Sequence, residues 1–448
     1  MNFKRWCLKH HLFFYFLFIF DSSSGIFCKK KKFNMERRIR VLCVPSDTGG
    51  CGLHRSLVPH QKLAERHSDE FDVVIDYKPD WRNLDYINSF DIIHFHKGVY
   101  QDMEGFHNAL KFCKENNITT IMDVDDNWEL GQFHPLYLTY KRNNMTNITR
   151  DNLNRADYIT TTTPIFAKHI RKFNPNVKVF VNAIDDIRIN ELKNNINNTG
   201  KLRIGFVMGS THRNDMELVR GMLSKISPET LEKVQFVLCG FDTRGTITEI
   251  HPDGTATPRP IRPEESVWFE YEKNITDNYR IVSPMYRDFL LKFAPQLDFP
   301  YANNEHYKRC WTKTVDNYEY MKHYNELDVL FVPLQDNMFN SCKSELKFIE
   351  AGMMGVAVVA SNFGPYTVGS VNFFEKGGKI NENGNCVLID NVKAHKEWGR
   401  TVERLVKNPE YVTKLKENMH KHIMENYHIN DMTADRANWY KQICKRNG

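Results

Sequence analysis

Four polar side chains in the second half of the sequence recur at intervals that suit one face of a helix. They are Asn340, Lys343, Lys347 and Glu350, separated by three, four and three residues. Lysine ammonium groups bind phosphate oxygens, and a glutamate carboxylate accepts hydrogen bonds from ribose hydroxyls. The stripe therefore predicts a site for a nucleoside diphosphate. The alternative is an exposed helix face on which lysine and glutamate pair with each other.

The neighbouring segments place this helix at the ligand-binding edge of a parallel sheet. Residues 328–334 are mostly apolar, and the strand predicted there ends at Pro333. Residues 356–360 form a second apolar run directly after Gly355. Such runs are typical of buried parallel strands, and glycine is a common helix stop. The helix then begins at the carboxyl end of a strand, where open α/β sheets bind their ligands.

A glycine-rich loop near the start of the chain has the composition of an anion site. Gly50, Gly52 and Arg55 follow the strand predicted at residues 39–44. Glycines let backbone N–H groups approach an anion at a helix N-terminus, and Arg55 would add a charge-assisted contact. A dinucleotide fingerprint is the competing interpretation. That motif's last glycine is missing here, and no acidic residue closes a clear second strand.

Two further groups of polar residues end predicted strands in the first half. His94 and His96 share one face of a strand, and His96 is nearer its carboxyl end. Asp123, Asp125 and Asp126 end another strand. We expect Asp125 or Asp126 to bind substrate hydroxyls or to orient His96. A divalent metal site and a helix cap are the alternatives.

Composition excludes several classes of protein. The chain has 448 residues, 41% of them hydrophobic, which is enough for two packed α/β domains. A net charge of +6 suits an anionic substrate or a membrane surface but is too weak for a nucleic-acid binder, so no specific nucleic-acid binding is predicted. The ten cysteines include no Cys-x-x-Cys pair, which favours a reducing compartment.

Residues 1–34 are expected to lie outside the folded part of the chain. An apolar run at residues 12–20 follows Lys4 and Arg5. The run is too short to cross a bilayer, which takes about 20 residues, and it resembles a signal peptide. Its composition of Phe, Leu, Tyr and Ile alone instead favours a spurious upstream extension before a functional start at Met35, with a signal or anchor segment as the alternative.

The pattern of predicted strands divides the remainder into two Rossmann-like, doubly wound α/β domains, residues 35–195 and 200–425. A polar, Asn-rich stretch at residues 185–200 is the expected linker. The second domain carries an insertion near residues 241–320, and we expect the helical tail at 426–448 to pack back on the first domain.

Five segments, in this order and spacing, match one family. The sequence resembles the retaining nucleotide-sugar glycosyltransferases of GT-B fold (glycosyl transferases group 1, or family 4-like) from about Arg38 to the C-terminus. The segments that carry the resemblance are residues 91–96, 156–164, 181–185, 203–209 and 339–361.

The resemblance implies roles for individual residues. His96 matches a histidine of the family's cleft that contacts the donor sugar or phosphate. Gly209 lies where family members place a glycine on the donor phosphates, followed by a basic residue. Arg213 is the expected phosphate contact, and His212 is the competing one. Ser344 belongs to the same donor-binding set.

The family usually carries two glutamates eight positions apart at the donor site. Glu350 matches the second, on the ribose, but Cys342 stands where the first is expected. Its role would pass to Glu345 or to backbone groups. The chain therefore resembles a divergent branch in which Lys343 and Lys347 supplement diphosphate binding.

The resemblance implies an enzyme that transfers a sugar from a nucleoside diphosphate sugar to a glycan, lipid-linked or other acceptor, with retention. His96, Asp125, Arg213 and Lys343 are the expected catalytic residues, without a cofactor or an obligatory metal. A cytoplasmic location, with peripheral contact to the inner face of the membrane, follows from the substrate and the cysteines. An NAD(P)-dependent oxidoreductase and a non-catalytic nucleotide- or sugar-binding protein remain as alternatives.

Overall fold

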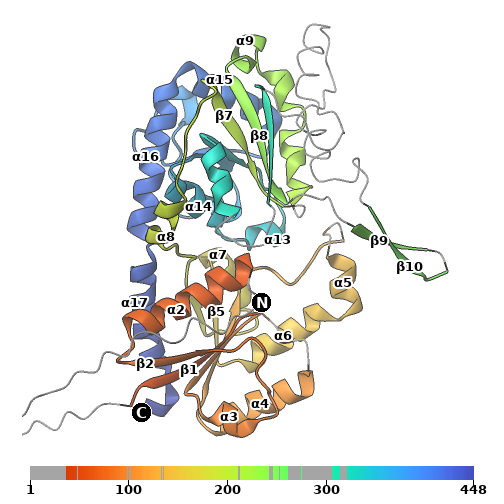
Figure 1. The fold of residues 1–448 in the computed structure, drawn as a ribbon, viewed down its shortest axis with the longest axis vertical. Coiled ribbons are helices and arrows are strands. Elements are labelled where there is room, and N and C mark those ends of the chain that lie inside the picture. The colour runs from red at the N-terminus through yellow and green to blue at the C-terminus, as the bar shows by residue number, and fades with distance from the viewer. Residues whose placement is uncertain are drawn as a thin grey trace, which may run out of the picture. The chain divides into compact units, whose positions relative to one another are not determined.

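The computed structural model describes residues 37–447 except for positions 48, 98, 100–101, 133, 135, 210–211, 242–245, 252, 261–273, 275–304 and 313–319. The predicted extension at 1–34 lies outside the described residues. The two large sheets, both within the compact unit Arg38–Gly448, have six parallel strands each (Figure 1).

The first sheet has the strand order β2-β1-β3-β4-β5-β6. Alternate residues of β1 point to opposite faces, so Val41 packs with Tyr440 on one side and Leu42 with Phe106 on the other. Burial of both faces explains why these strands are continuous apolar runs. The strands are β1 (Ile39–Val44), β2 (Phe71–Ile75), β3 (Ile92–His96), β4 (Thr119–Val124), β5 (Tyr158–Thr161) and β6 (Val177–Val179).

Short polar side chains start several helices of this half. Asp102 accepts a hydrogen bond from the Gly105 N–H at the start of α4, and Thr163 does so from the Phe166 N–H at α7. The helices are α1 (Gly50–Gly52), α2 (Val58–Arg66), α3 (Leu84–Asn88), α4 (Met103–Glu115), α5 (Tyr137–Arg142), α6 (Met145–Arg155), α7 (Pro164–Ile170) and α8 (Asp186–Leu192).

The second sheet has the order β11-β8-β7-β12-β13-β14, which is the classical order of doubly wound nucleotide-binding folds. Its strands are β7 (Leu202–Val207), β8 (Val234–Phe241), β11 (Tyr307–Thr312), β12 (Val329–Val332), β13 (Ala357–Ser361) and β14 (Val387–Ile389). Its helices are α9 (Pro228–Leu231), α13 (Met338–Ser341), α14 (Leu346–Met354), α15 (Ala394–Lys407) and α16 (Pro409–Asn426).

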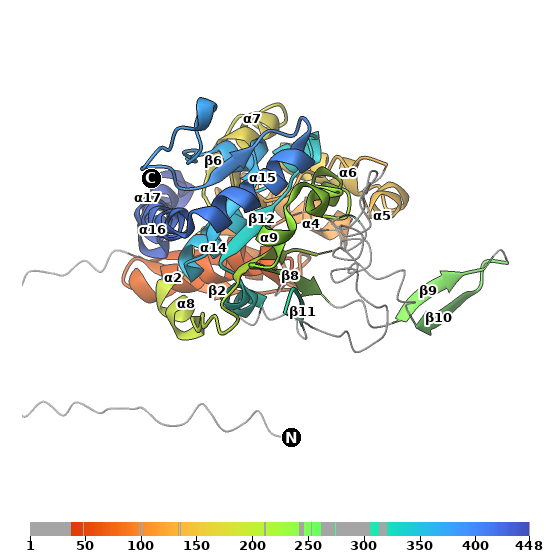
Figure 2. The ribbon, with the colours of Figure 1, turned by 90° about the horizontal axis from the view of Figure 1, so that it is seen from above.

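The insertion contributes three strands that the sequence did not predict. β9 (Thr246–Ile250) and β10 (Ala256–Pro260) pair as a separate antiparallel hairpin (Figure 2). β11 instead joins the second sheet as an edge strand, parallel to β8. Most of the remaining insertion, including the aromatic residues Trp268 and Tyr271, lies outside the described residues.

The predicted single helix from Asn340 to Met353 is wrong, because the structure contains two helices, α13 and α14, with a turn between them. Asn337 accepts a hydrogen bond from the Asn340 N–H at the start of α13. The Ser341 hydroxyl donates to the Met338 carbonyl at 2.8 Å, which satisfies one of the carbonyl groups at the end of this short helix. The helix start at Asn337 and this local bond set the limits of α13, so the four polar residues do not share one stripe.

The C-terminal segment crosses from the second sheet to the first. α16 packs on α14, and α17 (Ile429–Ile443) packs on α2. The Tyr440 hydroxyl lies 2.9 Å from His60 Nε2, and Thr119 donates to the Ile443 carbonyl at 2.8 Å. Within the described part of the chain, no helix has both the length and the apolar character that crossing a bilayer requires.

Candidate active site

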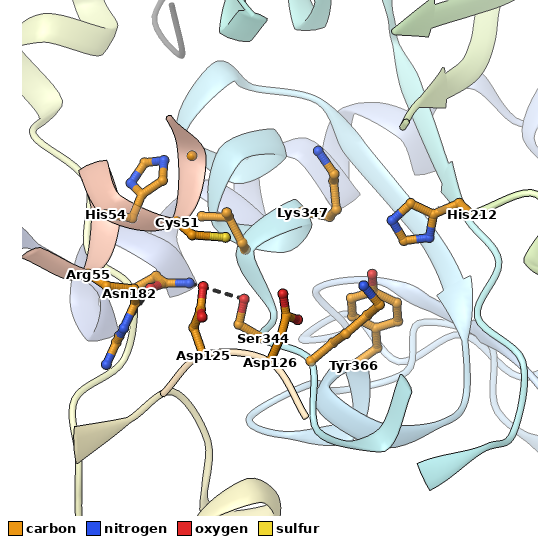
Figure 3. A pocket seen from close by; sticks show the side chains of 13 residues that line it. Cys51, His54, Arg55, Asp125, Asp126, Asn182, His212, Ser344, Lys347 and Tyr366 are labelled. Atoms are coloured by element: carbon orange, nitrogen blue, oxygen red, sulfur yellow. Dashed lines mark hydrogen bonds between the residues drawn. The ribbon is translucent and has the colours of Figure 1, made fainter. Parts of the chain in front are cut away.

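A cavity of about 190 Å³ lies where strands of both sheets end at their carboxyl edges. Figure 3 shows His54, Arg55 and Asn182 on one side, His212 and Tyr366 on the other, and Asp125, Asp126 and Ser344 between them. The full lining is Gly50, Cys51, His54, Arg55, Asp125, Asp126, Asn182, His212, Lys343, Ser344, Leu346, Lys347 and Tyr366. The carboxyl edges therefore bring together side chains from both halves, as open α/β sheets do.

Arg55 has a different environment from the anion contact expected of it. It is 1% exposed, and its guanidinium donates to both carboxylate oxygens of Asp123, at 2.9 and 2.8 Å. It also donates to the Phe180 carbonyl and to Asn182. Because the Asp123 carboxylate neutralises its charge, Arg55 holds the cavity wall together rather than supplying a free cation.

The glycine loop has only one of its two predicted glycines at the cavity. Gly50 lines it, whereas Gly52 is buried behind the loop. A Cβ on Gly52 would lie 2.0 Å from the Asp47 carbonyl oxygen, so close packing requires glycine there. The Asp47 carboxylate accepts the N–H groups of Gly49 and Gly52, at 2.9 and 3.2 Å.

The dinucleotide interpretation expects an acidic residue after the second strand, and the apparent lack of one was an argument against it. Asp76 does follow β2, so that argument is wrong. Its carboxylate accepts the Lys78 N–H at 3.0 Å and the Tyr86 hydroxyl at 3.1 Å. Both carboxylate oxygens are thus already engaged within the fold.

His96 and Asp125 interact, as the sequence suggested. His96 Nε2 lies 3.2 Å from Asp125 Oδ1, and Lys97 Nζ lies 3.3 Å from the same oxygen. Burial alone would raise the pKa of Asp125, but Lys97 and His96 hold it well below its usual range. Ser46 Oγ contacts the other ring nitrogen of His96 at 2.8 Å. His96 lines a separate cavity of about 550 Å³, not the candidate active site.

Asp126 differs from its neighbour Asp125. It is half-buried and lines the cavity, yet it makes no hydrogen bond or ion pair with any residue that the structure describes. Of the two aspartates, Asp126 therefore presents the carboxylate that remains available to a ligand.

On the second-sheet side, His212 lines the cavity and Arg213 does not. His212 Nδ1 lies 2.8 Å from Asp215, and burial lowers the pKa of the imidazole despite this contact. Arg213 is exposed and lies outside the cavity lining, as does half-buried Gly209. The short 3₁₀ segment at Asp215–Val219 follows this turn. The preference for Arg213 over His212 is therefore reversed.

Asn340 is buried away from the cavity. Its amide donates to Asp215 at 2.8 Å and to the Gln335 carbonyl at 3.0 Å. Both bonds tie α13 to the segments that follow β7 and β12, so Asn340 does not line the cavity, and its donor contact stays a prediction.

Lys343 and Ser344 lie in the turn between α13 and α14. The Lys343 ammonium lies 4.8 Å from the centre of the Phe339 ring, and it forms no ion pair within the described part of the chain. Asn182 donates to the Ser344 hydroxyl at 3.0 Å, which links the two sides of the cavity (Figure 3).

Lys347 and Glu350 form a buried pair on α14. Lys347 Nζ lies 3.0 Å from Glu350 Oε2, and the Tyr324 hydroxyl donates to the same oxygen. Burial opposes the charged ammonium, but Glu350 and Tyr320 together raise the pKa of Lys347 above its ordinary value. Lys347 lines the cavity, whereas Glu350 is 3% exposed and does not. Glu350 is therefore engaged by Lys347 and Tyr324, and its ribose contact stays a prediction.

Glu345, the expected substitute for the missing glutamate, is not among the residues that line the cavity. It is 2% exposed, and burial raises the pKa of its carboxyl to about 7. The Tyr427 hydroxyl and the charge of Arg55 act in the opposite direction. Neither carboxylate oxygen of Glu345 makes a hydrogen bond of good geometry with a described residue. The Tyr427 hydroxyl therefore offsets only part of the effect of burial on the pKa.

Two clusters in the described residues have the composition of metal sites. Cys51, Asp125 and Asp126 place one candidate ligand atom each within 4.8 Å of the others, in the cavity. Asp125 already carries the Lys97 ammonium, and burial raises the pKa of the Cys51 thiol, so a cation would have to displace both a charge and a proton. Cys43, His60 and His94 form the second cluster, which is fully buried near Arg436.

Sequence reasoning missed five of the lining residues, which are Cys51, His54, Asn182, Leu346 and Tyr366. His54 lies in the helical turn Leu53–Leu57 directly after the glycines, and Asn182 lies in a segment that carried the family resemblance, so position offered a signal for both. Tyr366 follows β13 and packs face to face with Phe348, with ring centres 4.8 Å apart. Only its place after a strand pointed to it, because its spacing matched no motif.

The fold can be compared with known proteins. No protein-family model matches the chain, and no curated protein matches it in sequence. HepE from Anabaena, in complex with UDP and glucose, matches 91% of this chain and 100% of its own, with a TM-score of 0.54 and 12% identity. Sucrose-phosphate synthase from Thermosynechococcus elongatus matches 91% and 99%, with a TM-score of 0.53 and 12% identity. The predicted GT-B fold, with two Rossmann-like sheets, is confirmed.

Proposed function

We propose that the protein is a glycosyltransferase that moves a sugar from a nucleoside diphosphate donor to a glycan, lipid-linked or other acceptor, with retention of configuration. One observation carries the proposal: the cavity at the carboxyl edges of both sheets is lined by the ammonium groups of Lys343 and Lys347 and by the imidazoles of His54 and His212. Diphosphate oxygens accept hydrogen bonds from these groups. The UDP and glucose bound by HepE support the same class of ligand.

In this proposal the second-sheet side stabilises the leaving diphosphate. Lys343 supplies an unpaired charge, and Glu350 positions Lys347. Asp126 accepts a hydrogen bond from the acceptor hydroxyl and takes its proton as the new bond forms, on the face of the sugar from which the diphosphate departs. The bond from the sugar to the diphosphate breaks, and Lys343 and Lys347 balance the charge of the leaving group, so the proposal needs no metal.

The proposal is tested with the full chain, UDP, a panel of UDP-sugars and NAD(P). We expect calorimetric binding of UDP and release of UDP from one of the sugars, with an anomeric NMR signal that reports retention. Binding of NAD(P) in place of UDP would support the oxidoreductase, and binding of a UDP-sugar without turnover would indicate a binding protein.

We further propose that this transfer belongs to polysaccharide biosynthesis in the cytoplasm, with peripheral contact at the inner face of the membrane. The eight cysteines in the described part of the chain are all free, which suits a reducing compartment. Cell fractionation tests the location: disulfide-bonded protein in an extracytoplasmic fraction would contradict it.

A further inference from the structure

Three cavities lie in a row from the candidate active site towards α5. The second, of about 160 Å³, shares Asp126 and Lys343 with the candidate active site. The third, of about 260 Å³, shares Leu130 and Tyr140 with the second and extends to Lys141. Because successive cavities share side chains, a ligand in the second cavity would reach the donor pocket at one end and α5 at the other.

The second cavity, here called the Trp128 cavity, has two N–H donors without a partner among the described residues. Trp128 is 2% exposed, and its indole Nε1 makes no hydrogen bond. The Leu136 N–H donates to His134 Nδ1 at 3.1 Å, so the ring proton of neutral His134 lies on Nε2, which is also without a partner. Burial lowers the pKa of His134 and favours this neutral form.

Unpartnered buried donors call for a ligand or an ordered water, because leaving such a group unsatisfied is unfavourable. Both donors belong to residues that line the same cavity. The side chains of Phe339 and Tyr140 supply flat apolar walls, which suit the apolar face of a ring. The cavity thus combines ring-sized apolar surface with two lining residues that each have an unpartnered N–H donor.

Asp126 supplies the opposite kind of group where the Trp128 cavity meets the donor pocket. Its carboxylate only accepts hydrogen bonds, and it has no partner among the described residues. A ligand hydroxyl that donates to Asp126 would lie at the boundary with the cavity that Lys343 also lines. This is where an acceptor hydroxyl must lie to meet a donor sugar.

We propose that the Trp128 cavity binds the sugar acceptor, which is a saccharide ring with two polar groups. One is a hydroxyl that donates a hydrogen bond to Asp126. The other is a carbonyl or carboxylate oxygen that accepts hydrogen bonds from the N–H groups of Trp128 and His134. The assignment of this ligand as the acceptor rests on the proposed function. A plain hydroxyl brings a proton that needs its own acceptor, whereas a carbonyl or carboxylate oxygen does not. The third cavity then holds the next unit of a longer chain.

Saturation-transfer NMR on the full chain tests this ligand class. The probes are the methyl glycosides of glucose, N-acetylglucosamine and glucuronic acid, each with saturating UDP. We expect the N-acetyl or the carboxylate probe to bind about three- to tenfold more tightly than the glucoside, as one or two added hydrogen bonds allow. Tighter binding of the N-acetyl probe would indicate an acylamino sugar, and tighter binding of the carboxylate probe would indicate a uronic acid. Equal affinity for all three probes would overturn the proposal.

Substitutions locate the binding. Trp128→Phe keeps an aromatic ring but removes the N–H, and we expect it to weaken the preferred probe about three- to tenfold with unchanged UDP affinity. Trp398→Phe is the matched control, because Trp398 is also fully buried with an unpartnered indole nitrogen but lies in the core of the second sheet. If Trp128→Phe does not fold, His134→Phe should weaken the probe and His134→Gln, which keeps an N–H, should restore it.

The outcomes separate this inference from the proposed function. If UDP binds and is released from a UDP-sugar but no glycoside binds, the saccharide site is wrong and the function stands. If the glycoside binds with the expected loss in Trp128→Phe but neither UDP nor a UDP-sugar binds, the saccharide site stands and the transfer activity is wrong.

Discussion

The two sides of the candidate active site treat charge in opposite ways. The first-sheet wall has the charges of Arg55 and Asp125 paired and buried, and leaves the carboxylate of Asp126 without a partner among the described residues. The second-sheet wall, which contains His212, Lys343 and Lys347, combines a buried pair with an ammonium that has no partner among the described residues. A paired network stabilises a fixed geometry, whereas an unpaired cation is free to bind an anion. In the proposed function, the first wall therefore organises the site, and we expect the second wall to bind the ligand's charge.

The largest effect is expected from Arg55→Met. Removal of one partner of a buried ion pair leaves the Asp123 carboxylate uncompensated, so the free energy of unfolding should fall by about 3–5 kcal/mol. Urea unfolding measures it. Lys343→Met is the control from the other wall and should stay within about 0.5 kcal/mol of the parent. Similar free energies of unfolding for the two variants would mean that the paired Arg55 and the unpaired Lys343 contribute equally to stability, so the two walls would not differ in this respect.

Glu345 tests the contact between the walls, because it is a buried carboxyl that faces Arg55 from the second half. With its folded pKa raised to about 7, the folded state binds the proton more tightly than the unfolded state. The protonated Glu345 carboxyl therefore contributes its full stabilisation at a pH below the pKa that it has in the unfolded chain. This stabilisation is lost as the pH rises through its folded pKa of about 7.

Glu345→Gln should remove this dependence. We expect it to raise the free energy of unfolding at pH 8 by up to about 3 kcal/mol, with little change at pH 4.5. Urea unfolding at a series of pH values measures the difference. An unchanged pH profile would mean that Glu345 is ionised at its ordinary pKa and that Arg55 compensates it.

Lys343→Met tests whether the unpaired cation binds the diphosphate. Loss of a charge-assisted hydrogen bond is typically about 1.5–3 kcal/mol, so UDP affinity should fall about 10- to 100-fold with unchanged stability. Titration calorimetry measures it. Lys376→Met, an exposed lysine elsewhere in the second half, is the matched control and should leave affinity unchanged.

The smallest effect is expected from metal removal. Because Lys97 and His96 already pair with Asp125, turnover of a UDP-sugar should change little in EDTA. A complete loss that Mn²⁺ restores would instead place a metal on Cys51, Asp125 and Asp126, and the first wall would then take part in diphosphate binding.

The predictability of the elements differed for a physical reason. Strands such as β1 and β12 are buried on both faces, so each must be a continuous apolar run that is visible in the sequence. β11 was missed because it lies at a sheet edge within a polar insertion. The break before α14 was missed because a side-chain cap and one serine bond, not hydrophobic periodicity, set the limits of α13.

The sequence by itself determined which residues end strands, because parallel sheets place those positions at one edge. It could not determine what each side chain contacts there. Arg55 and Asp123 are 68 positions apart, and Asn340 and Asp215 are 125 apart, so no spacing reveals either bond. Only the tertiary structure decided that Arg55 and Glu350 are already paired while Lys343 and Asp126 are left for a ligand. The reason is that a charged group's role depends on its nearest partners, which the fold brings together.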